Sequence, residues 1–161
     1  MRMPPADTAI LARRDAIAAG LRRLCAAPDA VITDEDEMRA YESDGLAAYR
    51  QLPLAVVLPR TTEEVAAVMR YCHEQKLPVL GRGAGTSLAG GAMPSADGGV
   101  IGLMKMREVL DLDFDNRSAT VQAGVTNIAV TQACEHEDFF YAPDPSSQLA
   151  CSIGGNVANN A

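Results

Sequence analysis

The segment over residues 78–91 most constrains how this chain folds. It runs from a short apolar stretch into a loop that holds five glycines, one arginine and two hydroxyl residues. Glycine tolerates positive φ and has no Cβ, so such a loop can bring several backbone N–H groups close together. A concave set of N–H donors binds an anion, most often a phosphate. The sequence therefore predicts a phosphate site in this first glycine loop (residues 81–91), with an unliganded surface loop as the alternative.

Two familiar nucleotide-binding motifs do not match this loop. The Walker motif needs Lys and then Ser or Thr where Gly91 and Ala92 stand. The dinucleotide fingerprint needs a third glycine where Thr86 or Leu88 stands, depending on the starting glycine. The residues after the loop include Pro94 and two further glycines, which are poor helix formers. The loop is therefore not expected to open a helix, which argues against a P-loop or a Rossmann domain.

The sequence before the loop predicts a strand, a helix and a second strand. Apolar runs cover residues 54–58 and 79–80. Between them, Thr61 and Glu64 have the spacing of a capping box, and an apolar stripe continues to about Gln75. A βαβ unit of this length makes a parallel strand pair. The first glycine loop then leaves the carboxyl end of a parallel strand, where α/β folds place their ligands.

Further helices and strands are expected around this unit. Apolar spacing predicts two helical segments, over residues 8–25 with Asp7 as the cap and from Thr33 toward Tyr41. The rest of the chain predicts a third strand over residues 100–104, a hairpin over residues 110–115 and 119–123, and a short helix capped by Thr126.

A second group of glycines and polar side chains lies in a second glycine segment (residues 141–160). Its prolines predict a rigid turn, and Gly154 and Gly155 permit close approach of the backbone to a ligand. Taken alone, the proline-containing stretch is also explained as a simple turn, and the two glycines are also explained as part of the entry to a helix. Together with the first glycine loop, they suggest one extended ligand that is contacted from two sides.

Composition excludes several other kinds of function. A net charge of −7 and a pI near 4.7 argue against nucleic acid or an anionic membrane as a partner. Four cysteines without Cys-x-x-Cys spacing and only two histidines argue against a zinc or iron–sulphur site. Asp111, Asp113 and Asp115 alternate along a strand, which does not wrap a calcium ion. Without a signal peptide or an apolar run of membrane-spanning length, we expect a cytoplasmic protein with free thiols.

The two glycine-containing regions resemble a known family. The residues Pro-Val-Leu-Gly-Arg-Gly-Ala-Gly-Thr-Ser-Leu-Ala-Gly-Gly, Tyr-Ala-Pro-Asp-Pro-Ser-Ser-Gln and Cys-Ser-Ile-Gly-Gly-Asn-Val-Ala occur in this order. They resemble the FAD-binding domain of the vanillyl-alcohol-oxidase/PCMH flavoproteins. The similarity is greatest to the FAD-linked subunit of bacterial glycolate oxidases, with D-lactate dehydrogenases as near kin. Tyr41-Glu-Ser-Asp-Gly-Leu, at residues 41–46, fits the same group.

The resemblance implies an α+β, PCMH-type FAD-binding fold. A small parallel βαβ subdomain would be followed by a mixed or antiparallel sheet subdomain with flanking helices, incomplete at the C-terminus. Residues 1–50 would form an N-terminal helical segment and residues 51–161 the FAD-binding domain. The motif of the family continues beyond Ala161, and its substrate-binding cap domain is not found in this sequence. The chain is therefore expected to be a fragment that binds FAD poorly and is inactive alone.

The resemblance also implies the site residues. The segment that wraps the FAD pyrophosphate would be Arg82, Gly83, Ala84, Gly85, Thr86 and Ser87, with Gly91, and Arg82 would be an electrostatic partner of the phosphates. The second cofactor-lining stretch would contribute Pro143, Asp144, Ser147, Ser152, Gly154, Gly155 and Asn160. Some relatives link FAD through a histidine in the first glycine loop. This loop contains none, so noncovalent FAD is expected.

The function implied is a flavin-dependent oxidoreductase that oxidises a small 2-hydroxy acid such as glycolate to the 2-keto acid. No catalytic residue and no metal are assigned. The alternatives are a D-lactate dehydrogenase of the same fold and a non-catalytic FAD-binding remnant or subunit of a larger complex. Companion flavoprotein-like and iron–sulphur subunits are the implied partners, and through them the protein would be peripheral to the inner membrane.

Overall fold

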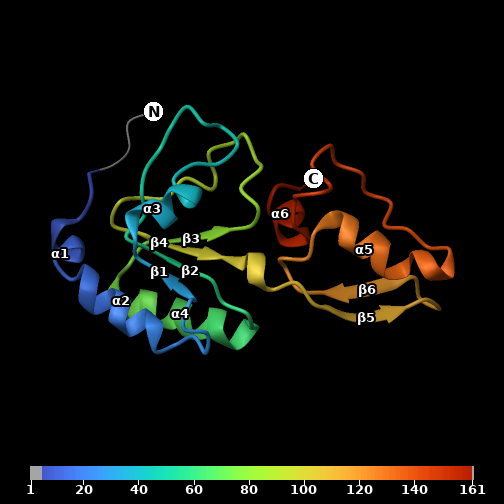
Figure 1. The fold of residues 1–161 in the computed structure, drawn as a ribbon, viewed down its shortest axis with the longest axis horizontal. Helices are drawn as coiled ribbons and strands as arrows, with labels where there is room; N and C mark the ends of the chain where they lie inside the picture. Colours follow the sequence, from blue (N-terminus) through green and yellow to red (C-terminus); the bar gives the residue numbers. More distant parts are fainter. Residues whose placement is uncertain (1–4, 161) are drawn as a thin grey trace.

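The computed structural model describes residues 5–160, which form two lobes side by side (Figure 1). The first lobe contains α1 (Thr8–Leu11), α2 (Arg14–Arg22), β1 (Val31–Ile32), α3 (Glu35–Met38), the 3₁₀ turn η1 (Arg39–Tyr41), β2 (Ala55–Val57), α4 (Thr62–Gln75), β3 (Val79–Arg82) and β4 (Gly99–Gly102). The second contains η2 (Leu103–Lys105), β5 (Val109–Asp113), β6 (Ser118–Val121), α5 (Asn127–Cys134), η3 (Glu135–Glu137) and α6 (Ile153–Ala158). A mixed sheet followed by an antiparallel pair with helices confirms the predicted α+β class.

The strand order of the first sheet differs from the simplest reading of the sequence. The order is β1-β2-β4-β3, with β1 antiparallel to β2 and with β4 parallel to both β2 and β3. The predicted strands β2 and β3 are thus parallel members of one sheet, but β4 lies between them. All four residues of β4 are buried. An apolar strand of this kind is stable only at the centre of a sheet that is covered on both faces.

Both faces of this sheet are covered by helices. Ala55 and Val57 of β2 point into a core with α2 and α4, whereas Val56 points into a core that α3 and η1 cover. Figure 1 shows α2 and α4 below the strands and α3 above them. Each fully buried Val side chain contributes about 1.5–3 kcal/mol. Because α2 supplies Ile17 and Leu21 to this core, the N-terminal helical segment packs against the strands of the following domain.

The capping box predicted for α4 is present in a modified form. The Thr61 hydroxyl accepts from the Glu64 N–H at 3.2 Å, as expected. The Glu64 carboxylate accepts from the N–H groups of Arg60 and Ala26, at 2.7 and 2.8 Å. It therefore ties the start of α4 to the loop after α2, and the helix ends at Gln75 as predicted.

Two other predicted elements are shorter than expected. The helix expected over residues 8–25 is divided into α1 and α2, although Asp7 caps the first as predicted. The strand expected over residues 100–104 ends at Gly102, where the chain turns into η2. This turn carries the chain from the first lobe to the second.

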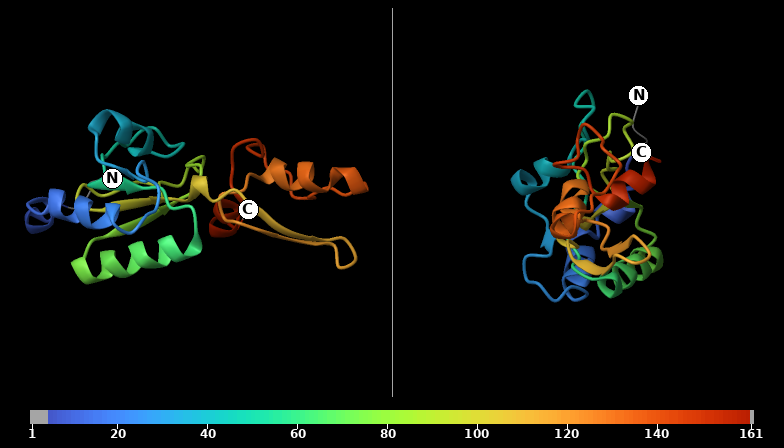
Figure 2. Two further views of the ribbon diagram at one scale, coloured as in Figure 1. Left: turned by 60° about the horizontal axis from the view of Figure 1, so that its bottom comes forward. Right: turned by 90° about the vertical axis from the view of Figure 1, so that its right-hand side faces the viewer.

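The second lobe is built on the predicted hairpin. β5 and β6 pair antiparallel and extend away from the first lobe, with α5 along one side (Figure 2). α6 returns the chain to the junction between the lobes (Figure 1). Among residues 5–160, no helix is both long enough and apolar enough to cross a membrane.

Candidate functional site

A cleft of about 500 Å³ lies where the two lobes meet. One wall is the first glycine loop, which leaves the carboxyl end of β3 as predicted, and the other is the second glycine segment with α6. The lining residues are Gly81, Arg82, Gly83, Ala84, Gly85, Thr86, Ser87, Gly91, Ala92, Leu103, Pro145, Ser147, Cys151, Ser152, Gly154, Gly155, Asn156, Ala158 and Asn159. No carboxylate is among these lining residues, although the chain carries a net charge of −7.

The first glycine loop presents free N–H donors. It contains no helix, as predicted, and Gly85 and Gly90 have φ values of 72° and 74°. In the part of the chain that the structure describes, no hydrogen bond uses the backbone N–H groups of residues 84–87 as donors. Free N–H groups in a loop without acidic side chains fit a diphosphate, because each can donate to a phosphate oxygen.

The second wall contributes packing rather than N–H donors. The Gly154 N–H donates to the Ala123 oxygen at 2.9 Å, and the Gly155 N–H donates to Ser152 Oγ at 3.3 Å. Ser152 is the N-cap of α6 and is buried. The free backbone N–H groups described above therefore belong to the first glycine loop, and the second segment closes the other side of the cleft.

The two walls touch each other at Gly83. A Cβ at this position would lie 2.5 Å from Ser152 Oγ and 3.7 Å from the Gly155 Cα atom. A side chain at this position would therefore displace the Ser152 hydroxyl. Gly83 lets the two walls meet closely, in addition to any contact with a ligand.

Arg82 lines the cleft, but its guanidinium is hydrogen-bonded to the main chain of the protein. The residue is buried, and its terminal nitrogens donate to three main-chain carbonyls. Burial lowers the pKa of Arg82, whereas the nearby Asp44 and Tyr41 side chains act to raise it. Burial also raises the pKa of Tyr41, whose ring centroid lies 5.8 Å from Arg82 Cζ. Three of the five N–H donors of the guanidinium are thus used within the protein, and the direct ion pair with a diphosphate that the sequence suggested stays a prediction.

Eleven of the fourteen residues predicted for the site line this cleft. They are Arg82, Gly83, Ala84, Gly85, Thr86, Ser87, Gly91, Ser147, Ser152, Gly154 and Gly155. The other three, Pro143, Asp144 and Asn160, are exposed and lie outside the lining set. The Pro143 oxygen instead accepts from Asn127 Nδ2 at 3.1 Å. Sequence reasoning missed Asn156 and Asn159, although their spacing of three predicts one face of a helix.

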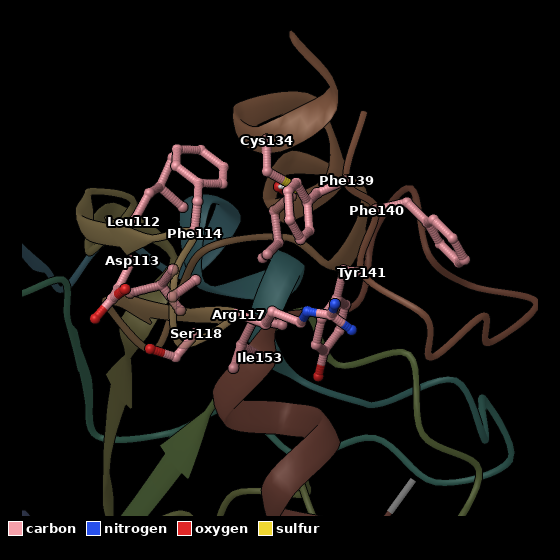
Figure 3. A pocket seen from close by; sticks show the side chains of 13 residues that line it. Leu112, Asp113, Phe114, Arg117, Ser118, Cys134, Phe139, Phe140, Tyr141 and Ile153 are labelled. Atoms are coloured by element: carbon pink, nitrogen blue, oxygen red, sulfur yellow. Dashed lines mark hydrogen bonds between the residues drawn. The ribbon is translucent and has the colours of Figure 1, made fainter. Parts of the chain in front are cut away.

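A second cavity of about 240 Å³ lies between the hairpin and α5 (Figure 3). It is lined mainly by apolar side chains, including Phe114, Val130 and Phe139, while Phe140 points away from it (Figure 3). Its lining includes Tyr141 and Ile153 of the second glycine segment but no residue of the first glycine loop. We therefore place the candidate site in the cleft between the lobes and not here.

Comparison with known proteins supports this assignment. Residues 53–161 match the family model described as an FAD binding domain. The chain is 50% identical over 131 residues to the glycolate oxidase subunit GlcD of Escherichia coli strain K12, covering 81% of this chain and 26% of that protein. It is 38% identical over 136 residues to a D-lactate dehydrogenase of Anaerostipes hadrus, covering 84% of this chain and 28% of that protein. The chain thus spans about a quarter of the length of the curated relatives that it matches.

The fold agrees with the same group. The structure of p-cresol methylhydroxylase with substrate bound aligns with 96% of this chain and 30% of its own, at a TM-score of 0.74 and 22% identity. This likeness confirms the PCMH-type fold. The chain belongs to the family of FAD binding domains, and its cofactor is FAD.

Proposed function

We propose that the chain is the flavin-binding part of an oxidoreductase and holds FAD noncovalently in the cleft between the lobes. The observation that carries the proposal is the shared cleft, which the first glycine loop and the second glycine segment both line. The free N–H groups of residues 84–87 would donate to the diphosphate oxygens. The protein is acidic, but no carboxylate is among the lining residues, so the diphosphate would meet no negative side chain in the cleft.

The residues that we assign to the walls of the FAD cleft combine the predicted set with those added by the geometry. From the predicted set we retain Arg82, Gly83, Ala84, Gly85, Thr86, Ser87, Gly91, Ser147, Ser152, Gly154 and Gly155, all in the cleft walls. We add Asn156 and Asn159, whose side-chain amides lie on the second wall. Pro143, Asp144 and Asn160 stay predictions. Gly83, Gly154 and Ser152 would act by shaping the cleft, because their atoms pack against other protein atoms.

The reaction that we propose is oxidation of a small 2-hydroxy acid, such as glycolate, to the 2-keto acid. FAD, when bound, would supply the redox chemistry by accepting a hydride. The part of this chain is to bind the cofactor and orient it. We assign no catalytic base, since neither His73 nor His136 lines the cleft. The identity of 50% to a glycolate oxidase subunit favours glycolate, and the identity of 38% to a D-lactate dehydrogenase keeps D-lactate as the alternative.

Noncovalent attachment is proposed because the first glycine loop and the cleft contain no histidine. Acid precipitation of flavin-loaded protein should leave the yellow colour in the supernatant. Yellow colour in the washed pellet would contradict noncovalent binding.

Partners and location are proposed from the relatives alone. GlcD is named as a subunit of glycolate oxidase. We propose flavoprotein-like and iron–sulphur companion subunits in the cytoplasm, with peripheral attachment to the inner membrane through them. A non-catalytic FAD-binding subunit of such a complex is the alternative to an enzyme.

The experiment that tests the function uses flavin absorbance. The protein, purified with the remaining regions that its relatives contain, should show a flavin spectrum. Anaerobic glycolate should bleach that spectrum faster than D-lactate does. Faster bleaching by D-lactate would favour the dehydrogenase, and bound flavin that neither acid bleaches would favour the non-catalytic subunit. Protein that takes up no FAD would contradict the proposal.

A further inference from the structure

Arg82 links two segments of the main chain through hydrogen bonds to three carbonyls. Its Nη1 donates to the Ser43 oxygen at 2.8 Å and to the Ala92 oxygen at 3.3 Å. Its Nη2 donates to the Ala40 oxygen at 3.4 Å. A Cβ at Gly85 would overlap Nη2, so the loop packs directly against the guanidinium. One side chain thus fixes the loop against a segment some forty residues earlier.

That earlier segment also contacts the loop through its own backbone. The Gly45 N–H donates to the Ser87 oxygen at 2.9 Å. A Cβ at Gly45 would lie 2.8 Å from the Thr86 oxygen, so the two chains are in close contact. Asp44 Oδ1 holds the turn by accepting from the Leu46 N–H at 2.9 Å. Residues 40–46, which we term the bracing segment, therefore support the part of the loop that carries the free N–H groups.

Asp44 provides the negative charge that accompanies the buried cation. Asp44 and Arg82 are each 6% exposed, and the two charges attract each other. Asp44 Oδ2 has no hydrogen-bond partner within the described residues. A buried carboxylate oxygen without a partner is costly, and a nearby positive charge offsets part of that cost. Asp44 is thus a negative charge near the Arg82 guanidinium within the protein.

We propose that Arg82 is a positioning residue, which acts with Asp44 and the bracing segment to hold the first glycine loop in the shape that presents its N–H groups to FAD. It does so without touching the cofactor. The inference rests on the proposed function, because FAD is the ligand that the loop would receive. A direct contact between Arg82 and FAD would predict the opposite change in the Kd for FAD when the Asp44 charge is removed.

The first test needs no ligand. In ¹⁵N-labelled chain, Arg82→Gln should lower the backbone order parameters of residues 84–87 from about 0.85 to below about 0.6. Hydrogen exchange of the Gly45 amide should become at least about tenfold faster, since its hydrogen bond to the Ser87 oxygen protects it from exchange. Val56 and Val100, in the central strands, should keep their protection, and the exposed Arg70→Ala variant should match the wild type. Should Arg82→Gln unfold the chain, Arg82→Lys is used, with a smaller change of the same sign. Unchanged order parameters in a folded variant would overturn the proposal.

The second test compares FAD titrations of wild type and Asp44→Asn. Under our proposal, loss of the Asp44 charge loosens the loop, so the Kd for FAD should rise about tenfold. If Arg82 contacted the diphosphate directly, removal of a neighbouring negative charge would lower the Kd. A lower or unchanged Kd would therefore overturn the positioning role. Failure of the wild type to bind FAD would contradict the proposed function, while the first test would still decide the role of Arg82.

Discussion

The Ser87 hydroxyl lies 3.3 Å from Asn159 Oδ1 and donates a hydrogen bond across the cleft. Ser87 belongs to the first glycine loop and Asn159 to the end of α6, so this contact joins the two walls directly. The walls come from parts of the chain that are 72 residues apart. The cleft is therefore a product of how the lobes pack, and changes at the contact between its walls should alter it.

Gly83→Ala should weaken the contact between the walls. The new Cβ would overlap Ser152 Oγ, which then has to leave its hydrogen bond to the Gly155 N–H. Loss of an N-cap costs about 1 kcal/mol, so urea unfolding should show a decrease of this order, and FAD affinity should fall. Gly81→Ala is the matched control, since no atom lies within 4 Å of its added Cβ. Equal stability of the two variants would contradict this role of Gly83.

Gly85→Ala should destabilise the protein more than Gly90→Ala does. Both glycines have nearly the same φ, 72° and 74°, so both substitutions carry a left-handed strain of about 1–2 kcal/mol. Only at Gly85 does the Cβ meet the Arg82 guanidinium, which its three hydrogen bonds hold in place. This overlap should lower the free energy of unfolding of Gly85→Ala by about 1–3 kcal/mol more than that of Gly90→Ala. Thermal or urea unfolding measures the difference. If Gly90→Ala were the more damaging change, Arg82 would not support the loop.

Glu64→Gln should make the protein less stable at neutral pH and alter its response to acid. Burial acts to raise the pKa of Glu64, but N–H donors from Ala26, Arg60 and Thr61 outweigh it and leave the pKa below its ordinary value of 4.5. A depressed pKa stabilises the fold above the unfolded value, and this contribution is lost as pH falls through the folded value. Solvent screening limits it to less than about 1 kcal/mol.

Urea unfolding between pH 7 and pH 3 measures this effect. The wild type should lose more stability over that range than Glu64→Gln does, with the two curves converging at the acid end. Parallel curves would show that Glu64 makes no pH-dependent contribution. Glu74→Gln, at an exposed position of the same helix, controls for a general change in charge.

Cys72 should resist thiol reagents in the folded protein. It is 2% exposed, and burial raises the pKa of its thiol to about 11, so little thiolate forms at pH 8. Cys25 is half-buried and should react first, although burial and the Glu64 charge raise its pKa as well. Mass spectrometry after brief alkylation, with Cys25→Ala as the control, measures the order of modification. If Cys72 were labelled as fast as Cys25, the core around α4 would have to open frequently, which would contradict this prediction.

Elements encoded by neighbouring residues could be predicted from the sequence. Thr61 and Glu64 lie in one turn of helix, so their spacing alone indicated where α4 begins. The hairpin of β5 and β6 followed from alternation on both sides of a short turn. In each case, the residues that determine the element lie within it.

Relations between distant segments could not be predicted in the same way. The position of β4 between β2 and β3 depends on burial from both faces, which no local pattern specifies. The loop containing Arg82 was identified, but two of the three carbonyls that accept from the Arg82 guanidinium lie some forty residues earlier. Asn160 was assigned to the cleft, whereas the end of α6 turns Asn159 toward it and gives Asn160 a φ of 51°.

The most direct test of the account is an amide chemical-shift titration of the ¹⁵N-labelled chain with FAD, which detects even weak binding. The account predicts that the largest shifts occur at residues 83–87 and, on the opposite wall, at Ser152, Gly155 and Asn159. Shifts confined to the apolar cavity around Phe114 and Phe139, or to one wall alone, would contradict a single flavin-binding cleft between the lobes.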